Sequence, residues 1–72
     1  MTKTEKIVQG LVYKGHQEVP CRSGKYRQFT IPMKPDTFIF VGKRAAVRVG
    51  TCASKSYSVT GSKFVKSLLT IG

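Results

Sequence analysis

The stretch "CRSGKYRQF" places basic side chains on both sides of an aromatic one. Arg22, Lys25 and Arg27 surround Tyr26. Lysine and arginine bind nucleic acid by displacing counterions from phosphates, and an exposed aromatic ring can stack on an unpaired base. If Phe29 faces inward in a strand, strict alternation turns Tyr26 outward among these cations. The other interpretation, which the sequence leaves open, packs Tyr26 at a strand end with its hydroxyl in water.

A second basic stretch, "FIFVGKRAAVRVG" at residues 38–50, predicts a β-hairpin. Glycine suits the first central position of a type II′ turn, so we expect a two-residue turn at Gly42-Lys43. In that register Arg44 and Arg48 share a face, and Lys43 sits at the tip. A protruding basic hairpin can grip phosphates, which arginine contacts in a bidentate manner. The alternative is a solvated face with snorkelling arginines.

The predicted register divides the hairpin into two faces. The face expected to be buried carries Phe38, Phe40, Ala45, Val47 and Val49. The face expected to mix apolar and cationic groups carries Ile39, Val41, Arg44, Ala46 and Arg48.

Positive charge dominates the composition. Lysine and arginine number 13 against 3 acidic residues, which gives a formal net charge of +10 over 72 residues. Such an excess favours binding to nucleic acid, to an anionic membrane or to an acidic protein. Surface lysines that serve solubility alone are the competing explanation, although solubility does not require acidic residues to be scarce.

Hydrophobic periodicity predicts the elements that would position these side chains. Strands are expected at 7–15, where Gly10 marks a bulge or a close backbone approach, at 25–31 and around Tyr57. The segment 32–36, with two prolines, is expected to be a stiff connector. After Ser62 as a helix N-cap, apolar residues recur at helical spacing, although a last strand ending in "LLTI" would also fit.

The predicted fold is therefore mainly β: a small antiparallel sheet or partly closed barrel of four or five strands with one short C-terminal helix. The polar residues 1–6 are expected to be a flexible N-terminus, and residues 7–72 a single small basic domain. A chain this short buries little core, so association with copies of itself or with a partner would add stability. No apolar run is long enough to span a membrane.

Catalytic and metal-binding residues are sparse. The acids Glu5, Glu18 and Asp36 are scattered, and a lone His16 gives little basis for activating a cysteine. Two cysteines and one histidine fall short of the four ligands of a structural zinc site. We expect no enzyme, metal or cofactor. Because no signal peptide is evident, Cys21 and Cys52 are expected to be reduced inside a cell, although the sequence does not decide whether they pair.

The first functional hypothesis is a non-enzymatic nucleic-acid-binding protein that prefers single-stranded DNA or RNA. Its predicted binding residues are Lys14, Arg22, Lys25, Tyr26, Arg27, Lys43, Arg44 and Arg48. By composition alone it is analogous to small basic viral proteins, so a virion is an alternative location to the cell interior. The second hypothesis is an accessory or structural protein, virion-associated or inhibitor-like, whose basic surface docks on an acidic protein.

Overall fold

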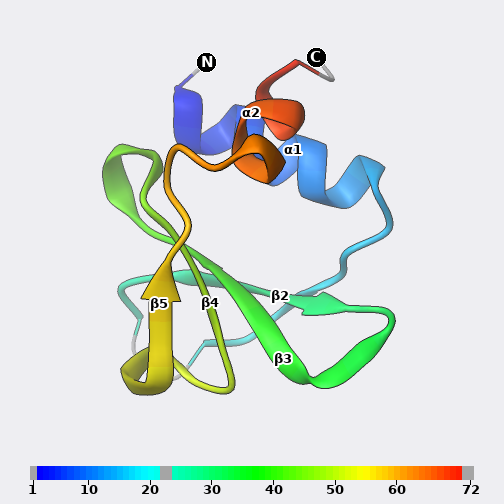
Figure 1. Cartoon of the computed structure of the whole chain (residues 1–72), viewed down its shortest axis with the longest axis vertical. Helices are drawn as coiled ribbons and strands as arrows, with labels where there is room; N and C mark the ends of the chain where they lie inside the picture. The colour runs from blue at the N-terminus through cyan, green and yellow to red at the C-terminus, as the bar shows by residue number, and fades with distance from the viewer. Residues whose placement is uncertain (1, 22–23, 71–72) are drawn as a thin grey trace.

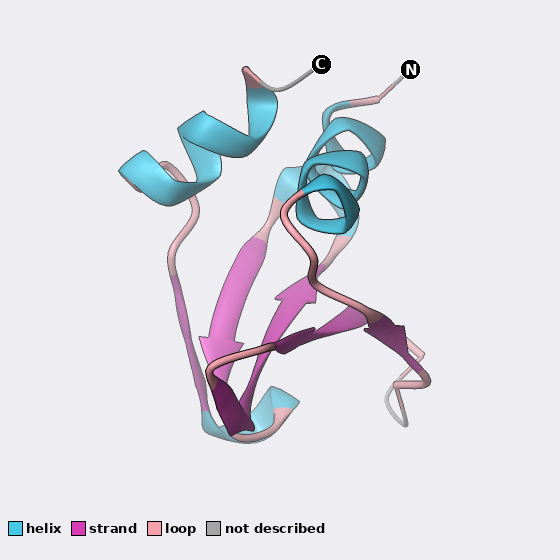
Figure 2. Ribbon diagram, turned by 90° about the vertical axis from the view of Figure 1, so that its right-hand side faces the viewer, coloured by secondary structure: helices cyan, strands magenta, loops and turns pink. Residues whose placement is uncertain are grey.

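Two α-helices lie over one face of a five-stranded antiparallel sheet in the computed structural model, which describes residues 2–21 and 24–70 (Figure 1, Figure 2). The helices are α1 (Lys3–Tyr13) and α2 (Lys63–Leu69). The strands are β1 (Glu18–Val19), β2 (Arg27–Ile31), β3 (Lys34–Val41), β4 (Val47–Gly50) and β5 (Ser56–Ser58). Short 3₁₀ turns, η1 (Lys43–Ala45) and η2 (Ala53–Lys55), precede β4 and β5.

The sheet confirms the predicted fold class of a small strand-rich domain with a C-terminal helix. Its order is β1-β2-β3-β4-β5, so each strand pairs with its neighbour in the sequence and β1 and β5 form the edges. The sheet is therefore open rather than a closed barrel. The connector between β2 and β3 is shorter than expected, because β3 already begins at Lys34 and continues through Pro35.

The strand expected at 7–15 is wrong, because this segment belongs to α1. The helix begins at Lys3, so part of the expected flexible N-terminus is its first turn. The Thr2 side chain caps it by accepting a hydrogen bond from the Glu5 backbone N–H at 3.2 Å. At the other end Gly15 adopts φ 94°, which lets the chain leave the helix in a left-handed turn.

Close contact with α2 explains why α1 has a glycine, Gly10, in its middle. A Cβ atom at this position would lie 2.8 Å from the carbonyl oxygen of Leu68 in α2. The close backbone approach that the sequence suggested therefore occurs, but between two helices rather than in a strand. The N-cap of α2 is Ser62, as predicted, and its hydroxyl accepts from the Val65 N–H at 3.3 Å.

The hairpin of β3 and β4 forms, but its predicted turn and register are wrong. Residues 42–46 join the two strands, and Val41 pairs with Val47 instead of Arg44. Gly42 is extended at φ −98° and ψ −173°, so it does not make the turn. The longer loop places the β-branched residues of both strands on one face, where they meet the helices. That burial outweighs the preference for a short glycine turn.

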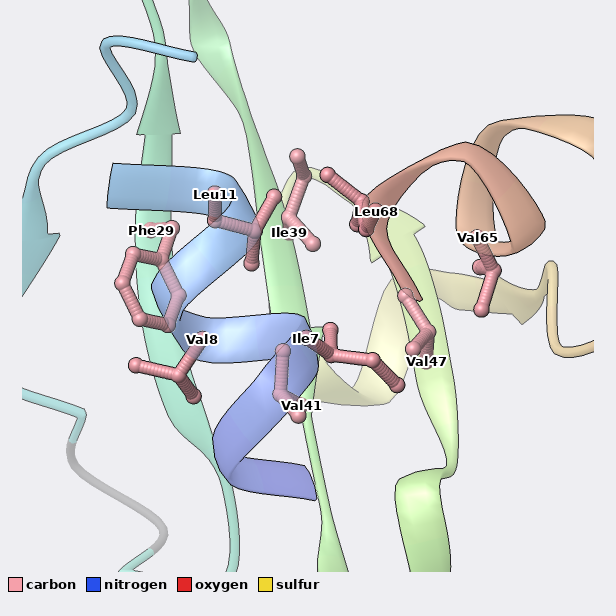
Figure 3. Packing of buried hydrophobic residues seen from close by; sticks show 9 residues of the cluster. All are labelled: Ile7, Val8, Leu11, Phe29, Ile39, Val41, Val47, Val65 and Leu68. Carbon is pink, nitrogen blue, oxygen red and sulfur yellow. The ribbon is translucent and has the colours of Figure 1, made fainter. Parts of the chain in front are cut away.

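The core lies between this face and the helices (Figure 3). It consists of Ile7, Val8, Leu11, Phe29, Ile39, Val41, Val47, Val65 and Leu68.

Two of these core residues, Ile39 and Val41, were expected on the mixed face of the hairpin, so the predicted faces are wrong for β3. In β4 the prediction is confirmed, because Val47 is in the core and Val49 packs against it. Phe40 is buried as predicted, with 1% of its surface exposed, but it alternates with Ile39 and Val41 and lies on the face away from the helices. Ala45, also expected in the buried strand face, lies in the loop and packs against the core from there.

Candidate functional site

Three neighbouring depressions meet around the β3–β4 loop, and Lys43 lines all of them. Their functional side chains come from three parts of the chain: the start of α1, the segment before β2, and the loop itself. We call the surface formed by Lys3, Lys25, Tyr26, Lys43 and Arg44 the basic groove. None of the described residues that line it is acidic. Folding thus gathers cations that are distant in sequence around neighbouring hollows that share Lys43.

Thr4 attaches the first turn of α1 to the loop that carries Lys43 and Arg44. Its Oγ1 accepts a hydrogen bond from the Ala45 backbone N–H at 2.9 Å and donates one to the carbonyl oxygen of Gly42 at 3.4 Å. The Gly42 N–H in turn donates to the Ala46 carbonyl oxygen at 2.7 Å. These hydrogen bonds constrain the backbone of the loop, which carries the cations Lys43 and Arg44.

The tip of the loop has an unusual backbone. Arg44 has φ 59° and Ala45 has φ 60°, both in the left-handed region that residues with a side chain seldom adopt. Such a conformation costs about 1–2 kcal/mol per residue and persists only where surrounding contacts enforce it. The Thr4 hydrogen bond to Ala45 is one such contact. We infer that this strained backbone is retained because it sets the position of the Arg44 side chain.

Tyr26 forms a wall of the basic groove. Its ring meets the Phe40 ring edge to face, with 6.2 Å between centroids and 71° between planes. A Cβ atom on Gly42 would come within 2.9 Å of Tyr26 Cε1, so glycine makes room for the ring. Tyr26 is half-buried: its ring packs at the start of β2 and also lines a surface hollow.

The structure brings together four of the eight predicted binding residues. Lys25, Tyr26, Lys43 and Arg44 line the basic groove. Arg22 lies outside the described residues. Arg27 lines one of the three depressions but is paired with Glu18, and Lys14 and Arg48 have partners elsewhere in the fold.

Arg27 touches the edge of the groove but is paired with Glu18 on the neighbouring strand. Its Nε and Nη2 atoms donate to the two carboxylate oxygens of Glu18, each at 2.7 Å. These hydrogen bonds, aided by the positive charge of Arg27, lower the pKa of Glu18, while slight burial opposes the effect. The pair is close to half exposed, so it fixes the β1–β2 edge with little energetic gain.

Arg48 holds β5 instead of projecting beside Arg44. Its Nε donates to the Ser56 hydroxyl at 2.8 Å, and its Nη2 donates to the Ser56 carbonyl oxygen. The predicted common face of the two arginines is wrong, because Arg44 belongs to the loop rather than to β4.

Lys14 joins the two helices at the end of α1 remote from Lys3. Its Nζ donates to the Ser67 hydroxyl at 2.8 Å and lies 5.2 Å from the centroid of the Phe64 ring. This cation therefore stabilises helix packing and lies away from the basic groove.

Lys3 is the groove residue that the sequence analysis missed. Lys3 was not considered as a binding residue because the polar residues 1–6 were expected to be flexible. A signal was present, however, because Thr2 and Glu5 have the spacing of a helix capping box. With Ile7, Val8 and Leu11 at helical spacing, that box predicts a helix starting at Lys3.

Other chemistry has little support in the described residues. His16 Nδ1 lies 2.8 Å from the Thr30 carbonyl oxygen, so this nitrogen carries the proton and donates, and the ring is held by the fold. No group of three metal-ligating side chains occurs in residues 2–21 and 24–70. No disulfide joins Cys21 to Cys52. Neither of the two described helices has the length and apolar character needed to cross a membrane.

Comparison with protein-family models, with curated proteins and with solved structures finds no match to this chain.

Proposed function

We propose that this protein binds nucleic acid without catalysing a reaction, that it prefers single strands, and that the basic groove holds the phosphates. The observation that carries the proposal is the convergence of Lys3, Lys25, Lys43 and Arg44 on three neighbouring hollows that share Lys43, with Tyr26 in the wall of two of them. Lys3, Lys43 and Arg44 have exposed side chains. Such a group can neutralise neighbouring phosphates of one strand.

The rest of the molecule supports attraction of a polyanion. The net charge of +10 would draw an anionic chain toward the surface from a distance, at a rate that falls with salt. Arg27 at the groove edge is already neutralised by Glu18, so the binding energy should come from the cations nearer the loop.

The preference for single strands rests on the shape of the surface. The groove cations surround a concave surface and come from loops and a helix start, and a flexible strand can follow such a path more closely than a stiff duplex. The aromatic wall at Tyr26 adds a surface against which an unpaired base can pack.

The test compares Lys43→Ala with Lys34→Ala in binding to a fluorescent single-stranded oligonucleotide over a salt series. Lys34 is an exposed lysine at the opposite end of β3, so it is a matched control outside the groove. We expect Lys43→Ala to lower the slope of log affinity against log salt by about 0.7, the value of one single-strand phosphate contact. Lys34→Ala should leave the slope unchanged.

The same titration with a duplex of equal length tests the strand preference, and a heparin column tests general anion binding. The single strand should bind more tightly than the duplex at equal salt. If the protein binds heparin but no oligonucleotide at low salt, the nucleic-acid proposal is wrong, and docking on an acidic protein becomes the better explanation of the charge.

A further inference from the structure

A second hollow lies on the face of the sheet away from the helices. It has a volume of about 270 Å³, and its described lining is Pro20, Cys21, Gln28, Phe40, Thr51, Cys52 and Ala53. We call it the sheet pocket. Drug-sized ligands occupy pockets of roughly 300–1,000 Å³, so a hollow of this size suits a single planar ring system or side chain.

The sheet pocket is lined by apolar side chains, Pro20, Phe40 and Ala53, and by a polar group that is open to a ligand. Phe40 and Gln28 are direct partners across β3 and β2, and Phe40 is almost completely buried. The Gln28 side-chain amide makes no hydrogen bond to any described part of the chain, so it can both donate to and accept from a ligand. No charged residue is among the described residues that line the pocket.

Tyr26 connects the sheet pocket to the basic groove. Its ring lines the groove and packs edge to face with the ring of Phe40, which is among the residues that line the pocket. The two hollows thus lie on either side of one aromatic pair. A strand whose phosphates lie in the groove would bring its bases toward the pocket.

We propose that the sheet pocket receives one unpaired nucleobase of the strand whose phosphates bind the basic groove. A base has what this lining requires: a flat apolar surface and an edge with both hydrogen-bond donors and acceptors, which an amide side chain can read. The cations of the neighbouring basic groove favour an occupant attached to a polyanion over a neutral peptide. The inference rests on the proposed function and explains the preference for single strands, since a paired base cannot enter.

Cys52, one of the residues that line the pocket, provides a reporter. The thiol is exposed, and hydrogen bonds from the Ser54 hydroxyl and from the Lys55 backbone N–H lower its pKa, so it reacts more readily with alkylating reagents. The experiment measures the rate at which iodoacetamide modifies Cys52, read by peptide mass spectrometry. It uses the free protein, its complex with a single-stranded oligonucleotide, and its complex with an abasic strand of equal length.

The abasic strand keeps the phosphates and lacks the bases, so it distinguishes phosphate binding in the basic groove from base binding in the sheet pocket. With each strand at about ten times its dissociation constant, we expect alkylation to slow about tenfold with the normal strand. With the abasic strand the rate should remain close to that of the free protein. Equal rates in the two complexes would overturn the pocket inference and leave nucleic-acid binding intact. Failure of both strands to bind would overturn both proposals.

A variant gives a second readout. Gln28→Ala should weaken binding of the normal strand about tenfold, because the amide no longer pairs with the base edge, and should leave binding of the abasic strand unchanged. Gln9→Ala is the matched control, because Gln9 is exposed on α1, away from both hollows. Equal weakening of both strands by Gln28→Ala would assign Gln28 a structural role and contradict the inference.

Discussion

The Thr4 side chain and the Ala45 backbone are separated by 41 positions in the sequence, yet they share a hydrogen bond of 2.9 Å. Through it the first turn of α1 supports the loop residue next to Arg44, which lines the basic groove. The loop and the helix start should therefore lose order together.

Thr4→Val tests this connection, because valine keeps the shape of threonine and removes the acceptor. We expect the free energy of unfolding to fall by about 1–2 kcal/mol, since a partly buried N–H loses its partner. Oligonucleotide affinity should fall as well. Thr4→Ser retains the hydroxyl and should behave more like the parent in urea denaturation and in binding. An unaffected stability in Thr4→Val would show that the loop needs no support from α1.

Arg44→Gly should separate stability from binding. Glycine adopts a positive φ without the steric cost that arginine bears, so we expect the free energy of unfolding to rise by about 0.5–1 kcal/mol. The loss of one phosphate contact should lower the salt slope for a single strand by about 0.7. Ala45→Gly retains every cation and should leave the slope unchanged. Parallel losses of stability and affinity in Arg44→Gly would contradict this interpretation of the loop.

Arg48→Ala should show the reverse pattern. Removing the two hydrogen bonds to Ser56 should cost about 1–2 kcal/mol of unfolding free energy. The salt slope should not change, because this guanidinium is occupied within the fold. Arg48→Lys should lose most of the same stability, since an ammonium lacks the planar fork. A lower salt slope with unchanged stability would show that Arg48 contacts phosphate, and would contradict its assignment as a structural residue.

Gly10→Ala should destabilise the protein although alanine is the better helix former. The new methyl group would meet the Leu68 carbonyl oxygen at 2.8 Å. Overpacking costs about 1–3 kcal/mol, which exceeds the helix-propensity gain of about 1 kcal/mol. Gln9→Ala, at an exposed position of the same helix, should be neutral or slightly stabilising in the same urea titration. Stabilisation by Gly10→Ala would show that α2 shifts freely.

Glu18→Gln should have a small, pH-dependent effect. Pairing with Arg27 lowers the pKa of Glu18 in the folded state, so its contribution is present above the ordinary glutamate pKa and is lost as pH falls through the folded value. The pair is exposed and screened by solvent, so we expect a loss of about 0.5 kcal/mol at neutral pH. The difference between parent and variant should shrink below about pH 4. A difference that grows at low pH would contradict the ion pair.

The sequence predicted the strand-rich fold well because the relevant signals are local. Alternating apolar residues mark β2 and β4, a continuous apolar run at 38–41 marks β3, and Ser62 with its following apolar stripe marks α2. The helix α1 was missed because Ile7 and Val8 favour a strand locally and Gly10 disfavours a helix, while the reason for tolerating Gly10 is contact with a distant helix. The turn at Gly42 was mistaken because register is decided by which valines and isoleucines reach the helices, a tertiary requirement.

The candidate site was predicted only in part for a related reason. Lys25, Tyr26 and Lys43 were identified from their types and neighbours. Which cations are occupied within the fold depends on strand pairing, as for Arg27 with Glu18 and Arg48 with Ser56, and composition does not contain this information. Lys3 joins the groove only once α1 is placed against the loop.

The order of the sheet has a consequence for how the chain folds. Because each strand pairs with the next one along the chain, the sheet can grow by successive hairpins, each closing a short loop at a low entropic cost. Docking of α1 on α2 instead joins opposite ends of the chain and requires the strands between them to be in place. We therefore expect the β2–β3–β4 meander to form in the folding transition state and the helices to dock after it. Substitutions at the contact between the helices should then accelerate unfolding and leave the folding rate nearly unchanged.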